Sequence, residues 1–247
     1  MKKEIVQQPK EEKVHAVFES IYDKYDYMNS VISFSLHKRW RKDVMKQMQV
    51  RPGSIALDIC CGTGDWTLQL AEAVGKEGKV IGLDFSRNML SIGEGKLKKT
   101  ASTNVTFVEG NALALPFPDE SFDYVTIGFG LRNVASYETA LREMHRVLKK
   151  DGLAVCLETS QPENKNIRSL YSLYFTKMMP ALGKYVANSY NEYSWLQEST
   201  MAFPNKNTLT SLFIKSGFQR VQVTPYSMGT VAAHFAQKAS RMSEGVQ

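Results

Sequence analysis

The sequence predicts a doubly wound α/β fold with a mostly parallel sheet, N-terminal helices and a helical insert. Three observations lead to this prediction. Short apolar runs alternate with helical segments from residue 54 onward, a glycine turn directly follows the first run, and helical spacing of apolar residues flanks the alternating part. The 247 residues, 43% hydrophobic and 23% charged, suffice for one well-buried domain.

The alternating part contains five apolar runs that are typical of buried parallel strands. These runs are 54–61, 79–83, 105–108, 122–127 and 153–157, and helices are expected to begin at Asp65 and to cover 86–99 and 137–148. Because helical segments connect successive runs, right-handed crossovers should place the strands in one parallel sheet.

Helices are expected before this part and again after it. Apolar residues at helical spacing predict a helix from about Val14 to Asn29-Ser30, and a basic amphipathic segment predicts a second one over Leu36–Met48. Residues 163–203 interrupt the alternation with aromatic-rich helices.

Two further strands close the chain. The runs 218–224 and 230–237 are joined by a short connection, which predicts an antiparallel hairpin at the sheet edge. The expected division of the single domain is an N-terminal helical lid (1–50), a cofactor-binding core (51–160), a helical insert (161–204) and C-terminal strands (205–240).

Composition excludes several classes of protein. No apolar run approaches the roughly 18 residues that a membrane-spanning helix needs, and the charged N-terminal stretch contains no apolar signal segment. We therefore expect a cytoplasmic protein. The three cysteines, Cys60, Cys61 and Cys156, lack disulfide or zinc-ligand spacing, so we expect reduced thiols and no metal.

The formal net charge of +6 favours anionic partners but does not identify one. An RNA substrate would require stacking aromatic residues along a continuous basic groove, and no such pattern is evident. We expect no nucleic-acid partner, while contact with an acidic lipid surface stays open.

A nucleoside site is predicted where the first strand ends. The turn Gly62-Thr63-Gly64 lets the backbone bend sharply and lets a ligand approach the main chain closely. Asp84 ends the second strand, roughly twenty residues further on, where a carboxylate can hold the two hydroxyls of a ribose. The loop after the third strand brings Asn111 and Ala112 within reach of an adenine.

The same turn lacks the third glycine that binds a diphosphate. Thr67 stands at that position, and Asp65 at the helix start would repel phosphate. The ligand should therefore carry a ribose without a phosphate chain. S-adenosylmethionine meets this requirement, and its positive groups favour acidic neighbours such as Asp58. A nicotinamide dehydrogenase is disfavoured by Thr67.

These motifs, in this order, resemble class I S-adenosylmethionine methyltransferases, a Rossmann-like fold, over most of the chain. The segment 25–40 is similar to the N-terminal signature of the ubiquinone/menaquinone biosynthesis C-methyltransferases. The matching positions are Tyr25, Asp26, Met28, Asn29, Ser33, His37 and Trp40. Residues 146–160 resemble the second signature of that family.

The sequence departs from the family pattern at several positions. Lys150-Asp151 replaces a usual proline and glycine, Cys60-Cys61 replaces small residues, and Gly128 stands where the fourth strand often has a serine. These changes alter individual side-chain contacts to the cofactor, including the contact expected at Gly128. The part of the pocket that the backbone forms should stay in place.

The resemblance implies methyl transfer from S-adenosylmethionine to a ring carbon of a prenylated hydroquinone. The short N-terminus and the lack of large insertions favour the branch that converts demethylmenaquinol to menaquinol. A ubiquinone-type benzoquinol or another small molecule remains an alternative substrate. A non-catalytic nucleoside-binding module is the alternative from another class.

Arg132 and Asn133 follow the fourth strand and are the candidate catalytic residues. The permanent cation of Arg132 could stabilise a phenolate or activate a water acting as base, with Asn133 orienting either one. The alternative is a surface Arg132 paired with an acid and an Asn133 that caps a helix. Tyr25 and His37 are secondary candidates for contacting the substrate.

An apolar stripe in the insert could hold the isoprenoid tail or face a membrane peripherally. Its members are Leu170, Leu173, Tyr174, Met178, Ala181, Leu182 and Tyr185, interrupted by Lys177. Core packing is the alternative for such a stripe. Nearby basic residues would suit anionic headgroups.

Overall fold

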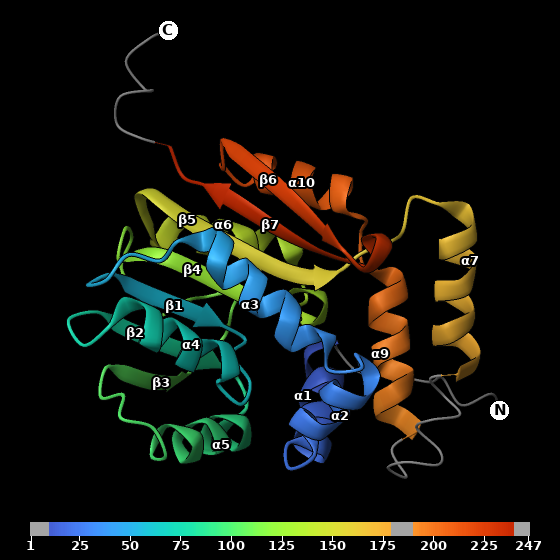
Figure 1. Cartoon of the computed structure of the whole chain (residues 1–247), viewed down its shortest axis with the longest axis horizontal. Coiled ribbons are helices and arrows are strands. Elements are labelled where there is room, and N and C mark those ends of the chain that lie inside the picture. The colour runs from blue at the N-terminus through green and yellow to red at the C-terminus, as the bar shows by residue number, and fades with distance from the viewer. Residues whose placement is uncertain (1–9, 179–189, 240–247) are drawn as a thin grey trace, which may run out of the picture.

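A seven-stranded sheet forms the centre of the protein (Figure 1). The computed structural model describes residues 10–178 and 190–239. The sheet order is β3-β2-β1-β4-β5-β7-β6. The strands are β1 Ile55–Ile59, β2 Lys79–Asp84, β3 Val105–Glu109, β4 Phe122–Gly128, β5 Leu148–Thr159, β6 Arg220–Tyr226 and β7 Val231–Gln237.

Strands β1 to β5 pair in parallel, whereas β7 runs antiparallel to both β5 and β6. The predicted doubly wound sheet and its edge hairpin are confirmed. From β1 the chain first builds outward through β2 and β3 and then returns to place β4 on the other side of β1. The carboxyl ends of β1 and β4 therefore form the switch point at which such sheets bind ligands.

Helices cover both faces of this sheet. Residues of α3 (Leu36–Met48) and α4 (Asp65–Val74) pack in one apolar cluster with β1, β2 and β5. Residues of α6 (Tyr137–Val147) and α10 (Lys206–Lys215) pack in another, on β4 and β5. The predicted helix 86–99 is α5 (Arg87–Leu97). Ser86 caps its N-terminus, because the Ser86 hydroxyl accepts the backbone N–H of Met89.

The structure differs from the predicted elements in three places. The first helix is broken into α1 (Lys10–Ile21) and α2 (Tyr25–Ile32), because the chain turns at residues 22–24. Strand β5 begins five residues early, and an irregular register absorbs the Asp151-Gly152 turn inside the strand. Helix α10 was not predicted, because only Leu209 and Phe213 of its residues are buried and the apolar period is short.

The described residues of the insert form α7 (Lys165–Leu173), a π-helical turn at Tyr174–Met178 (η2) and α9 (Tyr190–Ala202). Leu170, Leu173 and Met178 of the predicted stripe are exposed. Its members Ala181, Leu182 and Tyr185 lie outside the described residues. Within the described ranges, no helix is long and apolar enough to cross a membrane.

The N-terminal helices and the insert gather at one end of the sheet. Figure 1 shows α1, α2, α7 and α9 beyond the arrowheads of β1, β4 and β5. Lys13 of α1 pairs with Glu198 of α9 at 2.7 Å. The Lys10 ammonium donates to the carbonyl of Arg132, inside the short 3-10 helix η1 (Leu131–Asn133), and to that of Val134, which follows it. These contacts place the helices over the switch point.

Candidate active site

Two cavities adjoin each other at the switch point. The strand-tip cavity, about 480 Å³, lies among the ends of β1 and β2, the loop after β3 and helix α1. The inter-helix cavity, about 310 Å³, lies among α2, α3, the insert and the end of β5. Tyr25, Cys60 and Phe129 line both cavities. A ligand in one cavity would therefore meet a ligand in the other across these three side chains.

The glycine turn forms the floor of the strand-tip cavity. Gly62 and Gly64 have φ values of +55° and +77°, a region that favours glycine. The Gly62 N–H donates to the Asp84 carboxylate at 2.8 Å, and this glycine lines the cavity. Gly64 does not line either cavity as described; a Cβ there would lie 2.7 Å from the Phe107 ring. Gly62 thus faces the ligand side, while Gly64 allows close packing beneath the turn.

Asp84 is buried at the tip of β2 and lines the strand-tip cavity. Its two carboxylate oxygens accept one backbone N–H each, from Gly62 at 2.8 Å and from Ser86 at 3.0 Å. Burial raises the pKa of Asp84 to about 6. Because a carboxylate offers about four acceptor sites, each oxygen keeps a lone pair for one hydroxyl of a ribose.

Asp58 is buried at the end of β1 and borders the inter-helix cavity. Its oxygens accept the hydroxyls of Thr67 and Thr126, both at 2.7 Å, and burial raises its pKa to about 6. Thr67, which replaces the third glycine, therefore orients this carboxylate. The sequence indicated only the missing glycine and not this contact.

Polar side chains close the outer edge of the turn. Thr63 lines the inter-helix cavity and donates its hydroxyl to Asp26 at 2.6 Å. The Lys96 ammonium contacts Thr63 at 2.9 Å, Asp65 at 2.6 Å and Asp26 at 2.5 Å. The Asp65 carboxylate, expected to repel phosphate, is thus held by a cation on α5.

The loop after β3 provides the opposite wall of the strand-tip cavity. Asn111 and Ala112 both line it. The Asn111 side-chain oxygen accepts the N–H of Leu113 at 2.8 Å, so its amino group is the part available to a base. Phe85 and Phe18 add aromatic surface, and neither was singled out in the sequence.

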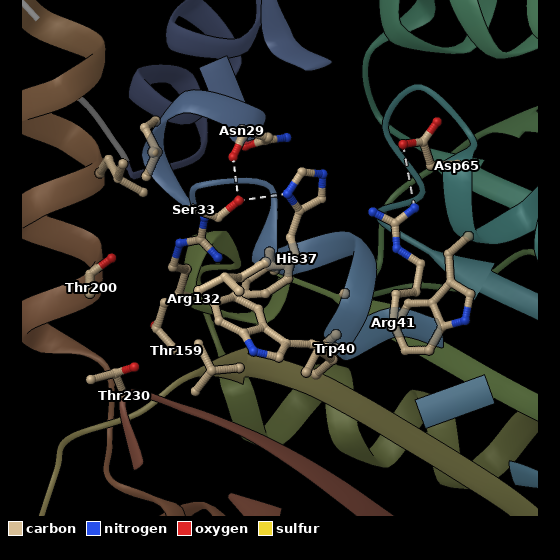
Figure 2. Close-up of a pocket in the computed structure, with 18 of the residues that line it drawn as sticks. Asn29, Ser33, His37, Trp40, Arg41, Asp65, Arg132, Thr159, Thr200 and Thr230 are labelled. Atoms are coloured by element: carbon tan, nitrogen blue, oxygen red, sulfur yellow. Dashed lines mark hydrogen bonds and ion pairs between the residues drawn. The ribbon is translucent and has the colours of Figure 1, made fainter. Parts of the chain in front are cut away.

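Arg132 lies in η1 and lines the inter-helix cavity, where Figure 2 shows its guanidinium among Ser33, His37 and Thr159. It is buried, and its Nη1 donates to Glu158 at 2.7 Å. Glu158 is 1% exposed and also accepts the backbone N–H of Arg132 at 3.2 Å. Arg132 is therefore paired with an acid, as the alternative supposed, but inside a cavity and not on the surface.

Asn133 faces a different cavity from its neighbour Arg132. It lines the strand-tip cavity, its oxygen accepts the Trp195 indole N–H at 3.1 Å, and its amino group donates to the Phe129 carbonyl at 3.4 Å. The helix that follows is capped by Ser136 and not by Asn133. Glu158 and Trp195 were not predicted, because their partners come together only in the folded chain.

Tyr25, His37 and Gly128 also reach the inter-helix cavity. The His37 Nδ1 lies 2.6 Å from the Ser33 hydroxyl (Figure 2). Burial, with the nearby Arg41 and Lys38 cations, lowers the pKa of His37 to about 4, so the ring is neutral near pH 7. Gly128 packs against Trp66, since a Cβ would lie 2.7 Å from that indole. No larger residue fits there without movement of Trp66.

In the dinucleotide fingerprint the residue at the position of Thr67 is a glycine that lets the helix pack closely on the strand, so Thr67 disfavours a diphosphate and favours a nucleoside held by its ribose and base. The strand-tip cavity is lined by the Asp84 carboxylate, which can accept ribose hydroxyls, and by the Asn111 amide, which can contact a base. This combination defines the class: an S-adenosylmethionine-dependent methyltransferase with the class I, Rossmann-like fold.

The chain belongs to the ubiE/COQ5 methyltransferase family, whose family model matches residues 6–238. It is 60% identical to the demethylmenaquinone methyltransferase of Alkalihalophilus pseudofirmus over 94% of this chain and 98% of that relative. It is 59% identical to the enzyme of that name from Geobacillus stearothermophilus, over 94% and 100%. A Thermotoga maritima S-adenosylmethionine-dependent methyltransferase has the same fold at 21% identity, with a TM-score of 0.64 over 90% of this chain and 99% of that structure.

Proposed function

We propose that the enzyme methylates a ring carbon of a prenylated naphthohydroquinone, converting demethylmenaquinol to menaquinol. The observation that carries this proposal is the inter-helix cavity, which adjoins the strand-tip cavity and combines aromatic walls with the buried guanidinium of Arg132. Two relatives that are 60% and 59% identical to this chain in sequence are named after this activity.

The residues that would hold the cofactor lie on four elements of the core. Asp84 would accept the ribose hydroxyls, Asn111 and Ala112 would contact the adenine, and Gly62 would allow close backbone approach. Asp58 and Thr63 line the inter-helix cavity and would suit the positively charged sulfonium and amino group of the cofactor. The bound cofactor supplies a methyl group made electrophilic by a sulfonium.

The chain must activate an aromatic carbon as a nucleophile. A quinone ring is electron-poor, whereas a hydroquinone that loses a hydroxyl proton places charge on the adjacent ring carbon. Arg132 would stabilise that phenolate, directly or through a water that takes the proton. Glu158 would hold the guanidinium in position through its contacts at 2.7 and 3.2 Å.

Atoms and charge balance across this step. The ring carbon would form a bond to the methyl carbon as the carbon–sulfur bond breaks, with that electron pair left on sulfur. The ring carbon would then lose its hydrogen as a proton to water, which restores aromaticity, and the phenolate oxygen would take a proton back. One proton is released overall. Tyr25, between the cavities, would align the two reactants, and neutral His37 with Ser33 would border the ring.

We further propose that residues 1–50 act as a lid, 51–160 as the cofactor-binding core, and 161–204 as the tail-binding insert. Tyr171, Tyr174 and Phe175 of the insert line the inter-helix cavity. On the same segment Leu170 and Leu173 face solvent. One side of α7 would therefore hold the first isoprenoid units, while its exposed side would rest on a membrane surface.

The direct test uses labelled S-adenosylmethionine with a panel of prenyl naphtho- and benzoquinones, each reduced and oxidised. We expect one methyl on a ring carbon of the reduced naphthoquinol and none on the oxidised compounds. Faster methylation of a benzoquinol would favour the ubiquinone-type substrate. Cofactor binding without turnover on any compound would favour a non-catalytic module.

Replacement of Arg132 tests its catalytic role in the same assay. Arg132→Ala should lower kcat by at least about a hundredfold, within the range seen when a charge-stabilising group is removed. Cofactor affinity should change little, because Arg132 donates its hydrogen bonds to Glu158 and not to Asp58, Asp84 or Asn111. Equal losses of turnover and cofactor affinity would contradict this role.

A further inference from the structure

Three buried polar side-chain atoms without a hydrogen-bond partner belong to residues that line the inter-helix cavity. They are the Nε of Arg132 and the hydroxyl oxygens of Thr159 and Thr200. In the described part of the chain only two other buried side-chain atoms, on Ser216 and His234, lack a partner. An unsatisfied buried polar atom destabilises the folded chain, because it has lost its hydrogen bonds to water. Their concentration around one cavity indicates that a ligand satisfies them.

Thr200 is the most informative of the three. It lies in α9, is 1% exposed, and its hydroxyl is turned toward the interior of the pocket in Figure 2. Helical serine and threonine hydroxyls commonly donate to a carbonyl in the preceding turn. The adjacent Ser199 does so, to Leu196 at 3.2 Å, whereas Thr200 does not. Its hydroxyl is therefore left free for a ligand.

Thr159 stands at the end of β5, directly after Glu158. Its backbone N–H donates to the Glu158 carboxylate at 2.7 Å, while its hydroxyl has no partner. The side chain thus reaches the cavity from the sheet, and Thr200 reaches it from the insert. Figure 2 shows the Arg132 side chain between the α2–α3 turn and Thr159, with Thr200 to one side.

We propose that Thr200 and Thr159 form a second polar subsite, which binds the ring oxygen of the substrate that stays protonated. This inference rests on the proposed function and deepens it. A guanidinium only donates hydrogen bonds and suits the phenolate, whereas a threonine hydroxyl both donates and accepts and suits a neutral hydroxyl. The enzyme would thereby select an aromatic ring with two para oxygens over a ring with one.

The test compares two substrates that differ by one hydroxyl: a prenylated naphthalene-1,4-diol and the matching naphthol that keeps only the hydroxyl next to the methylated carbon. The wild-type enzyme should favour the diol by roughly tenfold in kcat/KM, the value of one good hydrogen bond. Thr200→Val and Thr159→Val should each lower kcat/KM for the diol more than for the naphthol. The ratio in Thr200→Val should approach one, and Thr200→Ser should restore it.

Ser199→Ala is the matched control, since it removes a neighbouring hydroxyl that already has a partner. Its substrate ratio and its unfolding midpoint should match those of the wild-type enzyme. An unchanged ratio in both valine variants would overturn the subsite, and so would equal losses on both substrates, which indicate a packing role. A wild-type enzyme that methylates neither compound would instead contradict the proposed function.

Discussion

The buried Arg132–Glu158 pair couples stability to chemistry at the residue scale. Removing one partner of a buried ion pair commonly costs about 3–5 kcal/mol, while replacing both is often neutral. Arg132→Met should therefore lower the free energy of unfolding by about 3 kcal/mol, because Glu158 is 1% exposed and would lose its guanidinium. The double variant Arg132→Met/Glu158→Gln should recover most of that stability and none of the turnover. Urea unfolding and steady-state kinetics measure the two effects separately.

A second ion pair provides the control for that experiment. Lys149 and Asp123 are 3.0 Å apart, but their side chains are 37% and 21% exposed. Lys149→Met should change the free energy of unfolding by less than about 1 kcal/mol. If the double variant were as unstable as Arg132→Met, the loss would come from packing around η1 and not from an unpaired carboxylate.

The carboxyls of Asp58 and Asp84 should give folding and cofactor binding opposite pH dependences. Burial raises the pKa of each to about 6, above the ordinary value of 3.8, so the folded chain takes up protons more readily than the unfolded chain. The stability they contribute is present at low pH and is lost as the pH rises through 6. Between pH 7 and pH 5 each should add about 1 kcal/mol to the free energy of unfolding.

Cofactor affinity should fall over the same interval, because a protonated Asp84 offers the ribose a weaker acceptor. Calorimetric titration from pH 7 to pH 5 measures this affinity, and thermal unfolding of the ligand-free enzyme measures stability. Asp84→Asn should remove the contribution of Asp84 to both slopes. Parallel slopes in the wild type, or slopes unchanged in the variant, would refute the assignment.

Lys96 connects elements that are distant in the sequence, beside the glycine turn at residues 62–64. Its ammonium lies on α5 and contacts Asp26 on α2 and Asp65 on α4 at 2.5 and 2.6 Å. Lys96→Met should weaken the contact between the N-terminal helices and the glycine turn, leaving the Thr63–Asp26 hydrogen bond, and speed cofactor dissociation roughly fivefold. Stopped-flow fluorescence can follow this, since Trp40 and Trp66 line the adjoining cavity.

Arg87→Met is the comparison for the same helix. Arg87 pairs with Glu94 at 2.9 Å within α5 and touches neither the glycine turn nor α2 in the described contacts. The cofactor should dissociate from Arg87→Met at the same rate as from the wild-type enzyme. Equal acceleration in both variants would mean that α5 itself, and not the contact with the N-terminal helices, controls release.

Elements whose signals are local could be predicted from the sequence, and contacts between elements could not. The strand, turn and helix around Gly62 and Gly64 follow from adjacent residues, so β1 and α4 were located correctly. Helix α10 has few buried residues and a weak period, so its Asn205 cap was the only clear signal. The partners of Arg132 and Asn133, Glu158 and Trp195, are 26 and 62 residues away in the chain. Only the sheet order and the packing of α9 bring them together.

At the scale of the whole molecule, the two cavities of the site lie over different parts of the sheet. Asp84 and the loop with Asn111 and Ala112 lie at the ends of β2 and β3, whereas the aromatic residues of the insert lie toward β5. Tyr25, Cys60 and Phe129 stand between the two. Under the proposed function, the cofactor and the substrate would therefore meet at these three side chains.

That arrangement predicts that the enzyme takes its substrate from a membrane surface. Leu170, Leu173 and Met178 are 67%, 53% and 53% exposed on α7 and η2, beside the exposed Lys177. With a net charge of +6, the protein should sediment with anionic vesicles at low salt and less at high salt. Leu170→Ser/Leu173→Ser should weaken binding several-fold. Ile214→Ser, on α10 and 56% exposed, should have no effect. Equal binding by all three proteins, or none to anionic lipid at low salt, would exclude α7 as the membrane contact.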